Sequence, residues 1–224
     1  CDLLDTTLQD DNSIQKKIDA LVRTFESQNY TFLENKSKTK NPGAGIQKVV
    51  LLSSSHDSLN ALKGMINRSS AINRGMKLAK DLANRPGNIC TPKHLANEAR
   101  KLGRQKKKMS VKILEERDMK ELGMGALMAV SQGSIEPAKL IILNYKGSKN
   151  SDKPIVLVGK GVTFDSGGIS LKPGTGMDEM KYDMAGAAAV FGCMEAISSL
   201  EPKINVVGIV PATENMPDGG AIKP

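Results

Sequence analysis

A glycine-rich segment directly after a short apolar run constrains this chain more than any other part of it. The apolar run Pro154–Val158 is predicted to be a buried strand. Four charged side chains follow it among glycines: Lys160, Asp165, Lys172 and Asp183. In open α/β sheets, ligands gather beyond the carboxyl ends of strands, and glycines leave room around a carboxylate that binds a hard cation. The pattern fits a cation site or an ordinary loop with a solvated salt bridge.

Strands and helices are predicted to alternate through the C-terminal two thirds of the chain. The predicted strands are Val111–Leu114, Lys139–Tyr145, Pro154–Val158 and Asn205–Val210. The predicted helices run from Thr91 to about Lys107, from Arg117 to Leu122 and from Asp183 to Leu200. This alternation indicates an α/β fold whose sheet is covered by helices on both faces.

The N-terminal part reads as a separate, smaller piece. Its apolar spacing predicts a helix over Ser13–Leu33, a buried strand over Gln47–Ser53 and a long helix over Ser58–Leu82. Residues 1–55 are too few to hold a core alone. We therefore predict that residues 1–55 are the C-terminal part of a small α/β domain, that 56–85 form a linker helix, and that 86–224 form a larger domain.

Several ordered motifs together resemble one family. They are Asp81–Asn88, Met124–Ser134, Val158–Pro173, Met177–Gly186 and Pro211–Pro217. Their sequence is similar to the metal-site region of the leucyl (cytosol) aminopeptidases, two-metal enzymes that remove N-terminal residues, with leucine preferred, from peptides. The resemblance implies a mixed sheet flanked by helices, as part of a catalytic domain, preceded by the tail of a smaller α/β domain.

The resemblance also implies roles for five residues. Lys160, Asp165 and Asp183 would be metal ligands, Lys172 would stay protonated and bind the substrate or its developing oxyanion, and Met180 would line the pocket for the substrate's N-terminal side chain. Lysine ligation requires an amine that has lost its proton, which burial and a neighbouring cation favour. From the residues alone, other readings stay open. Asp165 could be a turn residue, Asp183 a helix N-cap, Lys172 an exposed loop lysine and Met180 a core methionine.

The implied cofactors are two divalent ions, Mn²⁺ or Zn²⁺, which lower the pKa of a bridging water and polarise the scissile carbonyl. Family members also hold bicarbonate through an arginine within an Asn-Thr-Asp-Ala-Glu-Gly-Arg segment. That segment does not occur in these 224 residues. We therefore expect a truncated chain that binds metal poorly and hydrolyses little. The alternative is a catalytically inactive relative or fragment with a binding role.

The charge distribution and the cysteine content limit which other partners and locations are expected. The net charge of +8 comes largely from two basic runs, Lys36–Lys40 and Arg100–Lys108. They leave DNA open as a partner, although no aromatic side chains are interleaved to stack on bases. Three distant cysteines fit a reducing, cytoplasmic location, and no apolar run is long enough for a membrane span. Peptide substrates and a homohexamer are implied by the resemblance.

Overall fold

The computed structural model describes residues 11–37, 46, 48–50, 56–149 and 152–223. The chain divides into two compact units, Cys1–Asn73 and Arg74–Pro224, and the division falls inside the long helix α2 (His56–Asn84). The predicted linker helix is therefore present as a helix. The predicted domain limits at residues 55 and 85 stay predictions.

The first unit contains helix α1 (Asp11–Asn29) and the N-terminal part of α2. The Ser69 hydroxyl oxygen links them, because it lies within hydrogen-bonding distance of both the Asp19 carboxylate and the Met65 carbonyl. The strand predicted over Gln47–Ser53 is not formed in its described part. Residues 48–50 are exposed and belong to no strand, and a strand gains stability only within a sheet. Gln47 and residues 51–53 lie outside the described residues.

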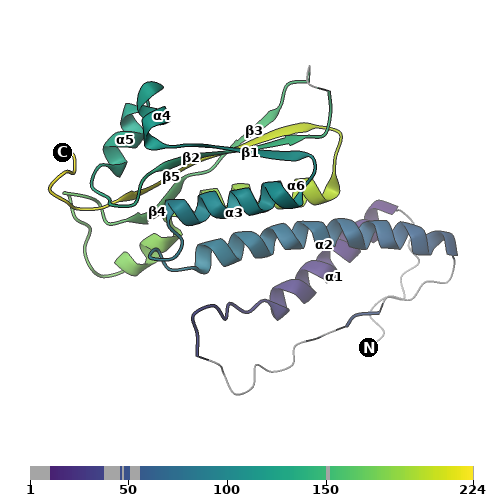
Figure 1. Ribbon diagram of the computed structural model, residues 1–224. Coiled ribbons are helices and arrows are strands. Elements are labelled where there is room, and N and C mark those ends of the chain that lie inside the picture. The colour runs from purple at the N-terminus through teal and green to yellow at the C-terminus, as the bar shows by residue number, and fades with distance from the viewer. Residues whose placement is uncertain (1–10, 38–45, 47, 51–55, 150–151, 224) are drawn as a thin grey trace. The chain divides into compact units, whose positions relative to one another are not determined.

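The second unit is built on a five-stranded mixed sheet (Figure 1). Its strands are β1 (Met109–Leu114), β2 (Lys139–Lys146), β3 (Ile155–Val158), β4 (Gly161–Asp165) and β5 (Asn205–Asn215). The order is β1-β2-β5-β3, and β4 also pairs with β5. Strand β2 pairs antiparallel with both β1 and β5, whereas β3 and β4 pair parallel with β5. The predicted α/β fold with a mixed sheet is confirmed.

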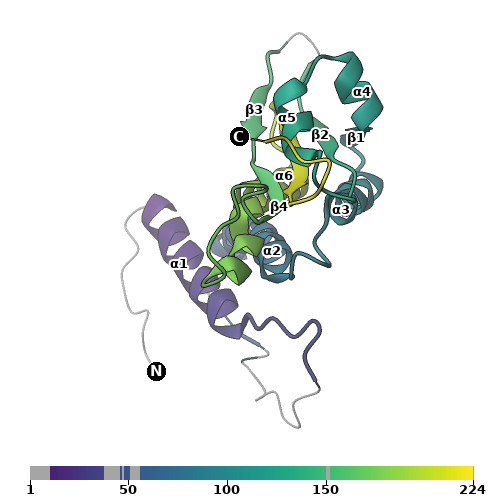
Figure 2. The same ribbon diagram turned by 90° about the vertical axis from the view of Figure 1, so that its left-hand side faces the viewer.

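Helices cover both faces of this sheet (Figure 2). Helices α3 (Pro92–Gln105) and α6 (Ala185–Leu200) pack on one face, and α4 (Glu116–Glu121) and α5 (Gly125–Ser131) on the other. The side chains of β2 alternate accordingly. Ile141, Leu143 and Tyr145 belong to the larger core, and Leu140 and Ile142 to the smaller one. The larger core therefore lies between the sheet and helices α3 and α6.

Local sequence signals explain where the helices begin. Thr91 caps α3, because its Oγ1 accepts a hydrogen bond from the His94 N–H at 3.3 Å. Pro92 occupies the first turn, where its missing N–H costs nothing. Helix α6 is preceded by a 3₁₀ helix, η1 (Met177–Met184), so it begins at Ala185 and not at Asp183 as predicted. The short helix α5 was not predicted.

Two predictions about the strands next to the glycines are wrong. The residues 161–165, taken from the sequence as a glycine-rich loop, form strand β4, because the N–H and C=O groups of this segment pair with those of β5. Strand β3 is exposed rather than buried. Its only described neighbour in the sheet is β5, and few side chains cover it. Asp165 therefore ends a second strand and does not directly follow the first.

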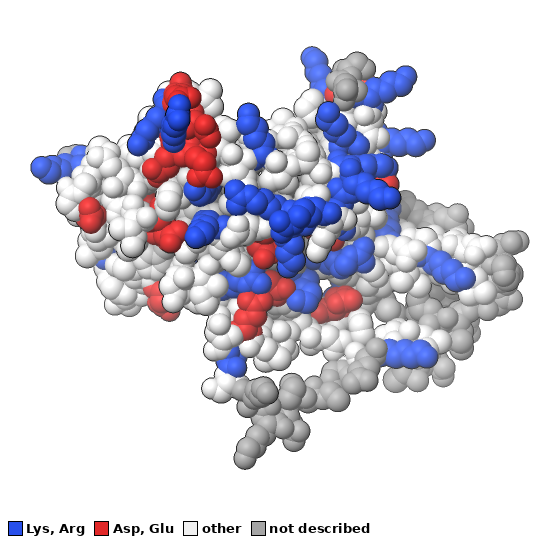
Figure 3. Space-filling view, viewed as in Figure 1, with Lys and Arg blue, Asp and Glu red and all other residues white. Residues whose placement is uncertain are grey.

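Basic side chains gather over α3 and the turn after it (Figure 3). The basic run Arg100–Lys108 is partly neutralised by acidic neighbours. The Lys106 Nζ lies 3.1 Å from Glu195, and the Lys108 Nζ lies 2.5 Å from Glu201. These pairs fit a basic helix C-terminus that faces solvent. No described helix is long and apolar enough to cross a membrane.

Candidate metal centre

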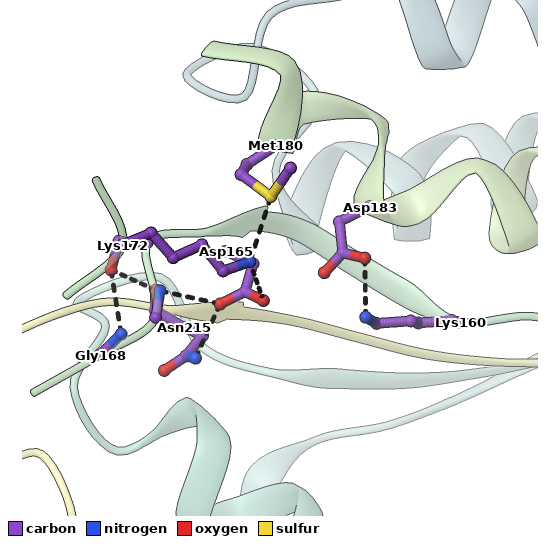
Figure 4. A network of polar contacts seen from close by, with 9 residues as sticks. Lys160, Asp165, Gly168, Lys172, Met180, Asp183 and Asn215 are labelled. Atoms are coloured by element: carbon purple, nitrogen blue, oxygen red, sulfur yellow. Dashed lines mark hydrogen bonds and ion pairs between the residues drawn. The ribbon is translucent and has the colours of Figure 1, made fainter. Parts of the chain in front are cut away.

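Two lysine–aspartate pairs lie beside the end of strand β4 (Figure 4). The Lys172 Nζ is 2.7 Å from Asp165 Oδ2, and the Lys160 Nζ is 2.6 Å from Asp183 Oδ1. Strand β4, which ends at Asp165, packs against η1, which carries Asp183. The structure therefore brings all four predicted charged residues into one region.

A close backbone approach holds the Lys160 side of this region in place. The Ala187 N–H, in the first turn of α6, donates to the Lys160 carbonyl at 2.8 Å. Gly159 permits this contact, because a Cβ there would lie 2.3 Å from the Gly186 carbonyl oxygen. The connection between β3 and β4 can thus lie directly against the start of α6. Lys160 is thereby fixed beside Asp183, which lies just before that helix.

Asp165 is held by more donors than an ordinary turn aspartate. Its Oδ1 accepts from the Gly167 N–H at 2.9 Å and from Asn215 Nδ2 at 2.8 Å, while Oδ2 accepts from Lys172. Partial burial raises the pKa of this carboxyl, but the hydrogen bonds from Lys172, Gly167 and Asn215 and the charge of Lys172 outweigh it. The net pKa is lowered. Asp165 is therefore an ionised carboxylate at neutral pH.

One carboxylate oxygen of Asp183 accepts a hydrogen bond, and the other has no partner. Oδ1 accepts from Lys160, while Oδ2 is buried and has no hydrogen-bond partner. The N-cap reading of Asp183 is wrong, because Met184 occupies that position and no side chain caps α6. A buried carboxylate oxygen without a partner is costly. A cation bound at Oδ2 would remove that cost.

Lys160 and Lys172 differ in their surroundings, though not entirely as predicted. The Lys160 side chain is 59% exposed, so the dry environment expected for a lysine ligand is not present in the described part of the chain. Lys172 is 36% exposed. Its Nζ also contacts the Met180 thioether at 3.1 Å, so Met180 lies beside the ion pair.

The donor set fits a divalent cation only in part. Asp165 and Asp183 offer hard carboxylate oxygens, as such a cation requires. Within the described ranges, however, no cluster of three or more His, Cys, Asp or Glu side chains could hold a metal. Asp165, Asp183 and Lys160 remain the predicted ligands in this region of the described chain.

Sequence reasoning missed Asn215 and a second pair of acids. Glu214 and Glu136 both line a cavity of about 730 Å³. Burial raises the pKa of Glu214 above its ordinary 4.5, the charge of Glu136 adds to the rise, and a 2.6 Å hydrogen bond from the Ser134 hydroxyl opposes it. Glu136 Oε2 is buried without a partner. No spacing rule predicts this pair, because it joins residues 78 positions apart.

The Glu214→Gln chain is expected to be more stable than the wild type at pH 7. A raised pKa means that the folded state binds the Glu214 proton more tightly than the unfolded state, so stability falls as pH rises from 4.5 through the folded pKa. Glutamine has no proton to lose, so the free energy of unfolding of Glu214→Gln should not fall over this pH range. Its advantage over the wild type should disappear below pH 4.5. Urea unfolding from pH 4 to 8 measures both. Glu179→Gln, at an exposed position, is the control, and an equal gain in that variant would contradict the assignment.

Two of the three cysteines, Cys90 and Cys193, lie in the described part of the chain. Burial raises the pKa of the Cys90 thiol to about 12, which leaves it protonated at neutral pH. Cys193 is exposed, and both cysteines are free thiols. The chemistry of the described residues therefore centres on the lysine–aspartate pairs.

Comparison with known proteins decides the family. Residues 77–224 match the catalytic domain of the cytosol aminopeptidase family. The chain belongs to the cytosol aminopeptidase family. The match lies within the second unit and contains the whole lysine–aspartate region.

Curated aminopeptidases and one solved enzyme structure are similar to most of the chain. Probable cytosol aminopeptidases of Aromatoleum aromaticum and Nitrosococcus oceani are 53% and 50% identical over 91% of this chain. The bottromycin maturation enzyme BotP, solved in complex with Mn, is 33% identical over 93% of the chain with a TM-score of 0.76. The chain spans 41% of the two aminopeptidases and 42% of the BotP chain.

Proposed function

We propose that this chain supplies part of the divalent-metal centre of an aminopeptidase that releases N-terminal residues, preferably leucine, from peptides. The observation that carries the proposal is Asp183 Oδ2, a buried carboxylate oxygen without a partner, next to the ionised Asp165. Both residues offer the hard carboxylate oxygens that a divalent cation binds. Membership of the cytosol aminopeptidase family supports the same chemistry.

Lys160, Asp165 and Asp183 would hold the metal ions. Bound divalent ions would lower the pKa of a water molecule and polarise the scissile carbonyl. Lys172 forms an ion pair with Asp165, and its ammonium would donate to an oxyanion in the same crevice. Met180 offers an adaptable apolar surface beside the Lys172 ammonium, which suits the side chain of an N-terminal leucine. The two lysines thus have separate tasks.

The metal, partners and location follow from the same proposal. Mn²⁺ is the first ion to test, because the similar enzyme BotP was solved in complex with Mn, and Zn²⁺ is the second. The substrates are peptides with a free N-terminus. These 224 residues do not contain the arginine segment that would hold bicarbonate, so no bicarbonate site is assigned to them. We further propose a cytoplasmic location, in line with the relatives' name, and assembly into hexamers.

Hydrolysis of leucine p-nitroanilide tests this function. The purified chain with added Mn²⁺ is expected to release p-nitroaniline slowly, but at least about tenfold faster than with EDTA, since metal activation and the charge on Lys172 both act on the transition state. Asp183→Asn and Lys172→Ala should lower the Mn²⁺-dependent rate to the EDTA level. Glu179→Gln, an exposed acid in the same 3₁₀ helix, should keep it. A rate unaffected by EDTA and by both substitutions would contradict the proposal.

A further inference from the structure

We propose that Asn215 is a positioning residue that presents one chosen oxygen of Asp165 to the metal. This inference rests on the proposed function, because it assumes that Asp165 binds a cation. Asn215 is the last residue of β5 and stands directly opposite Asp165 in the parallel pairing of β4 with β5. Its Nδ2 donates to Asp165 Oδ1 at 2.8 Å (Figure 4).

The backbone of Asn215 is anchored twice by one buried residue. The Ser166 N–H and the Ser166 hydroxyl both donate to the Asn215 carbonyl, at 2.9 and 2.7 Å. Ser166 is almost fully buried, so water does not compete for these bonds. The end of β5 is therefore fixed relative to the residue that directly follows Asp165.

The side chain of Asn215 occupies a space that only glycine leaves free. A Cβ on Gly168 would lie 2.7 Å from Asn215 Oδ1, and Gly168 has a φ of +72°. Its N–H also donates to the Ser166 hydroxyl at 3.3 Å. The turn after β4 thus closes around the Asn215 carboxamide and leaves its Nδ2 facing Asp165.

This arrangement makes the two oxygens of Asp165 unequal. Oδ1 accepts from two neutral donors, the Gly167 N–H and Asn215 Nδ2, and both belong to fixed backbone segments. Oδ2 accepts only from the Lys172 ammonium, which ends a long, partly exposed side chain that can turn away. Oδ2 is then the oxygen available to a cation. Partners that orient a metal ligand in this way typically contribute 10- to 100-fold to affinity.

Mn²⁺ titration of matched asparagine variants tests the inference. Asn215→Ala is expected to weaken Mn²⁺ binding about tenfold. Asn205→Ala removes side-chain hydrogen bonds to Lys149 and Asp152 at the opposite end of the same strand, so it should lower stability similarly but leave Mn²⁺ affinity within about twofold. Electron paramagnetic resonance of free Mn²⁺ gives the affinity, and urea unfolding without metal gives the stability.

A second pair of variants tests the inference independently, in case Asn215→Ala does not fold. Gly168→Ala is expected to weaken Mn²⁺ binding by displacing the carboxamide. Gly123→Ala carries the same backbone strain, since its φ is also +72°, but nothing lies within 4 Å of the added Cβ. It should therefore leave Mn²⁺ affinity unchanged. Crystal structures without metal should show one Asp165 carboxylate orientation in the wild type and a changed one in Asn215→Ala and Gly168→Ala.

The results distinguish a failure of the Asn215 inference from a failure of the proposed metal centre. If the wild type binds Mn²⁺ and Asp165→Asn abolishes binding, but Asn215→Ala and Gly168→Ala bind like their controls, only the positioning role of Asn215 is overturned. A wild type that binds no Mn²⁺ overturns the proposed metal centre, and the role of Asn215 falls with it.

Discussion

The Asp183→Asn chain is expected to bind Mn²⁺ at least about tenfold more weakly than the wild type, because the loss of a charged ligand lowers divalent-cation affinity steeply. Its stability without metal should nevertheless stay within about 1 kcal/mol of the wild type. The Lys160–Asp183 pair is largely exposed on the lysine side, and such pairs contribute little. The carboxylate also leaves Oδ2 buried and without a partner, so removing its charge relieves a cost.

Electron paramagnetic resonance of free Mn²⁺ measures the affinity of Asp183→Asn, and urea unfolding measures its stability without metal. Glu179→Gln makes the same change of charge at an exposed position in the same 3₁₀ helix and should leave both quantities unchanged. A large loss of metal-free stability in Asp183→Asn, with Mn²⁺ affinity retained, would show that Asp183 is a structural residue.

The Gly159→Ala chain is expected to lose both stability and metal affinity. The added Cβ would lie 2.3 Å from the Gly186 carbonyl oxygen, which is backbone and cannot rotate away. Overpacking of this kind typically costs about 1–3 kcal/mol. Moving the β3–β4 connection away from α6 would also stretch the 2.8 Å hydrogen bond from Ala187 to the Lys160 carbonyl. Lys160 and Asp183 would then separate.

Gly174→Ala provides the comparison for this second result. It makes the same substitution in the loop before η1, and nothing lies within 4 Å of the added Cβ. Thermal unfolding and Mn²⁺ titration should place Gly174→Ala near the wild type and Gly159→Ala well below it. If the two variants behave alike, the close approach at Gly159 does not hold the site together.

The sequence predicted those features whose signal is local. The periodicity of residues 139–145 and 91–107, and the Thr91-Pro92 start, led to elements that the structure contains. The four charged residues followed from glycines and charges within 25 positions of one another. Their convergence depends on the strand end at Asp165 and on the helix start after Asp183, and the local sequence predicted neither correctly.

Other features depend on long-range packing and were missed or wrong. Residues 161–165 form a strand only because β5 pairs with them across 50 positions. Asn215 contacts Asp165 across the same distance, and no local pattern marks it. Lys160 was expected in a dry site, yet its exposure depends on which segments cover it, which its neighbours in sequence do not specify. Short apolar runs such as Ile155–Val158 likewise do not reveal whether a strand is central or at an edge.

Mn²⁺-induced broadening of the backbone NMR signals tests the central claim most directly, because a paramagnetic ion affects only nuclei close to where it binds. With the wild-type chain and sub-stoichiometric Mn²⁺, the amide signals of Lys160, Asp165, Gly167 and Asp183 should broaden first, and the Asp165→Asn/Asp183→Asn double variant should show no selective loss. Broadening centred elsewhere, on Glu136 and Glu214 for instance, or no selective broadening in the wild type, would contradict the assignment of this metal centre.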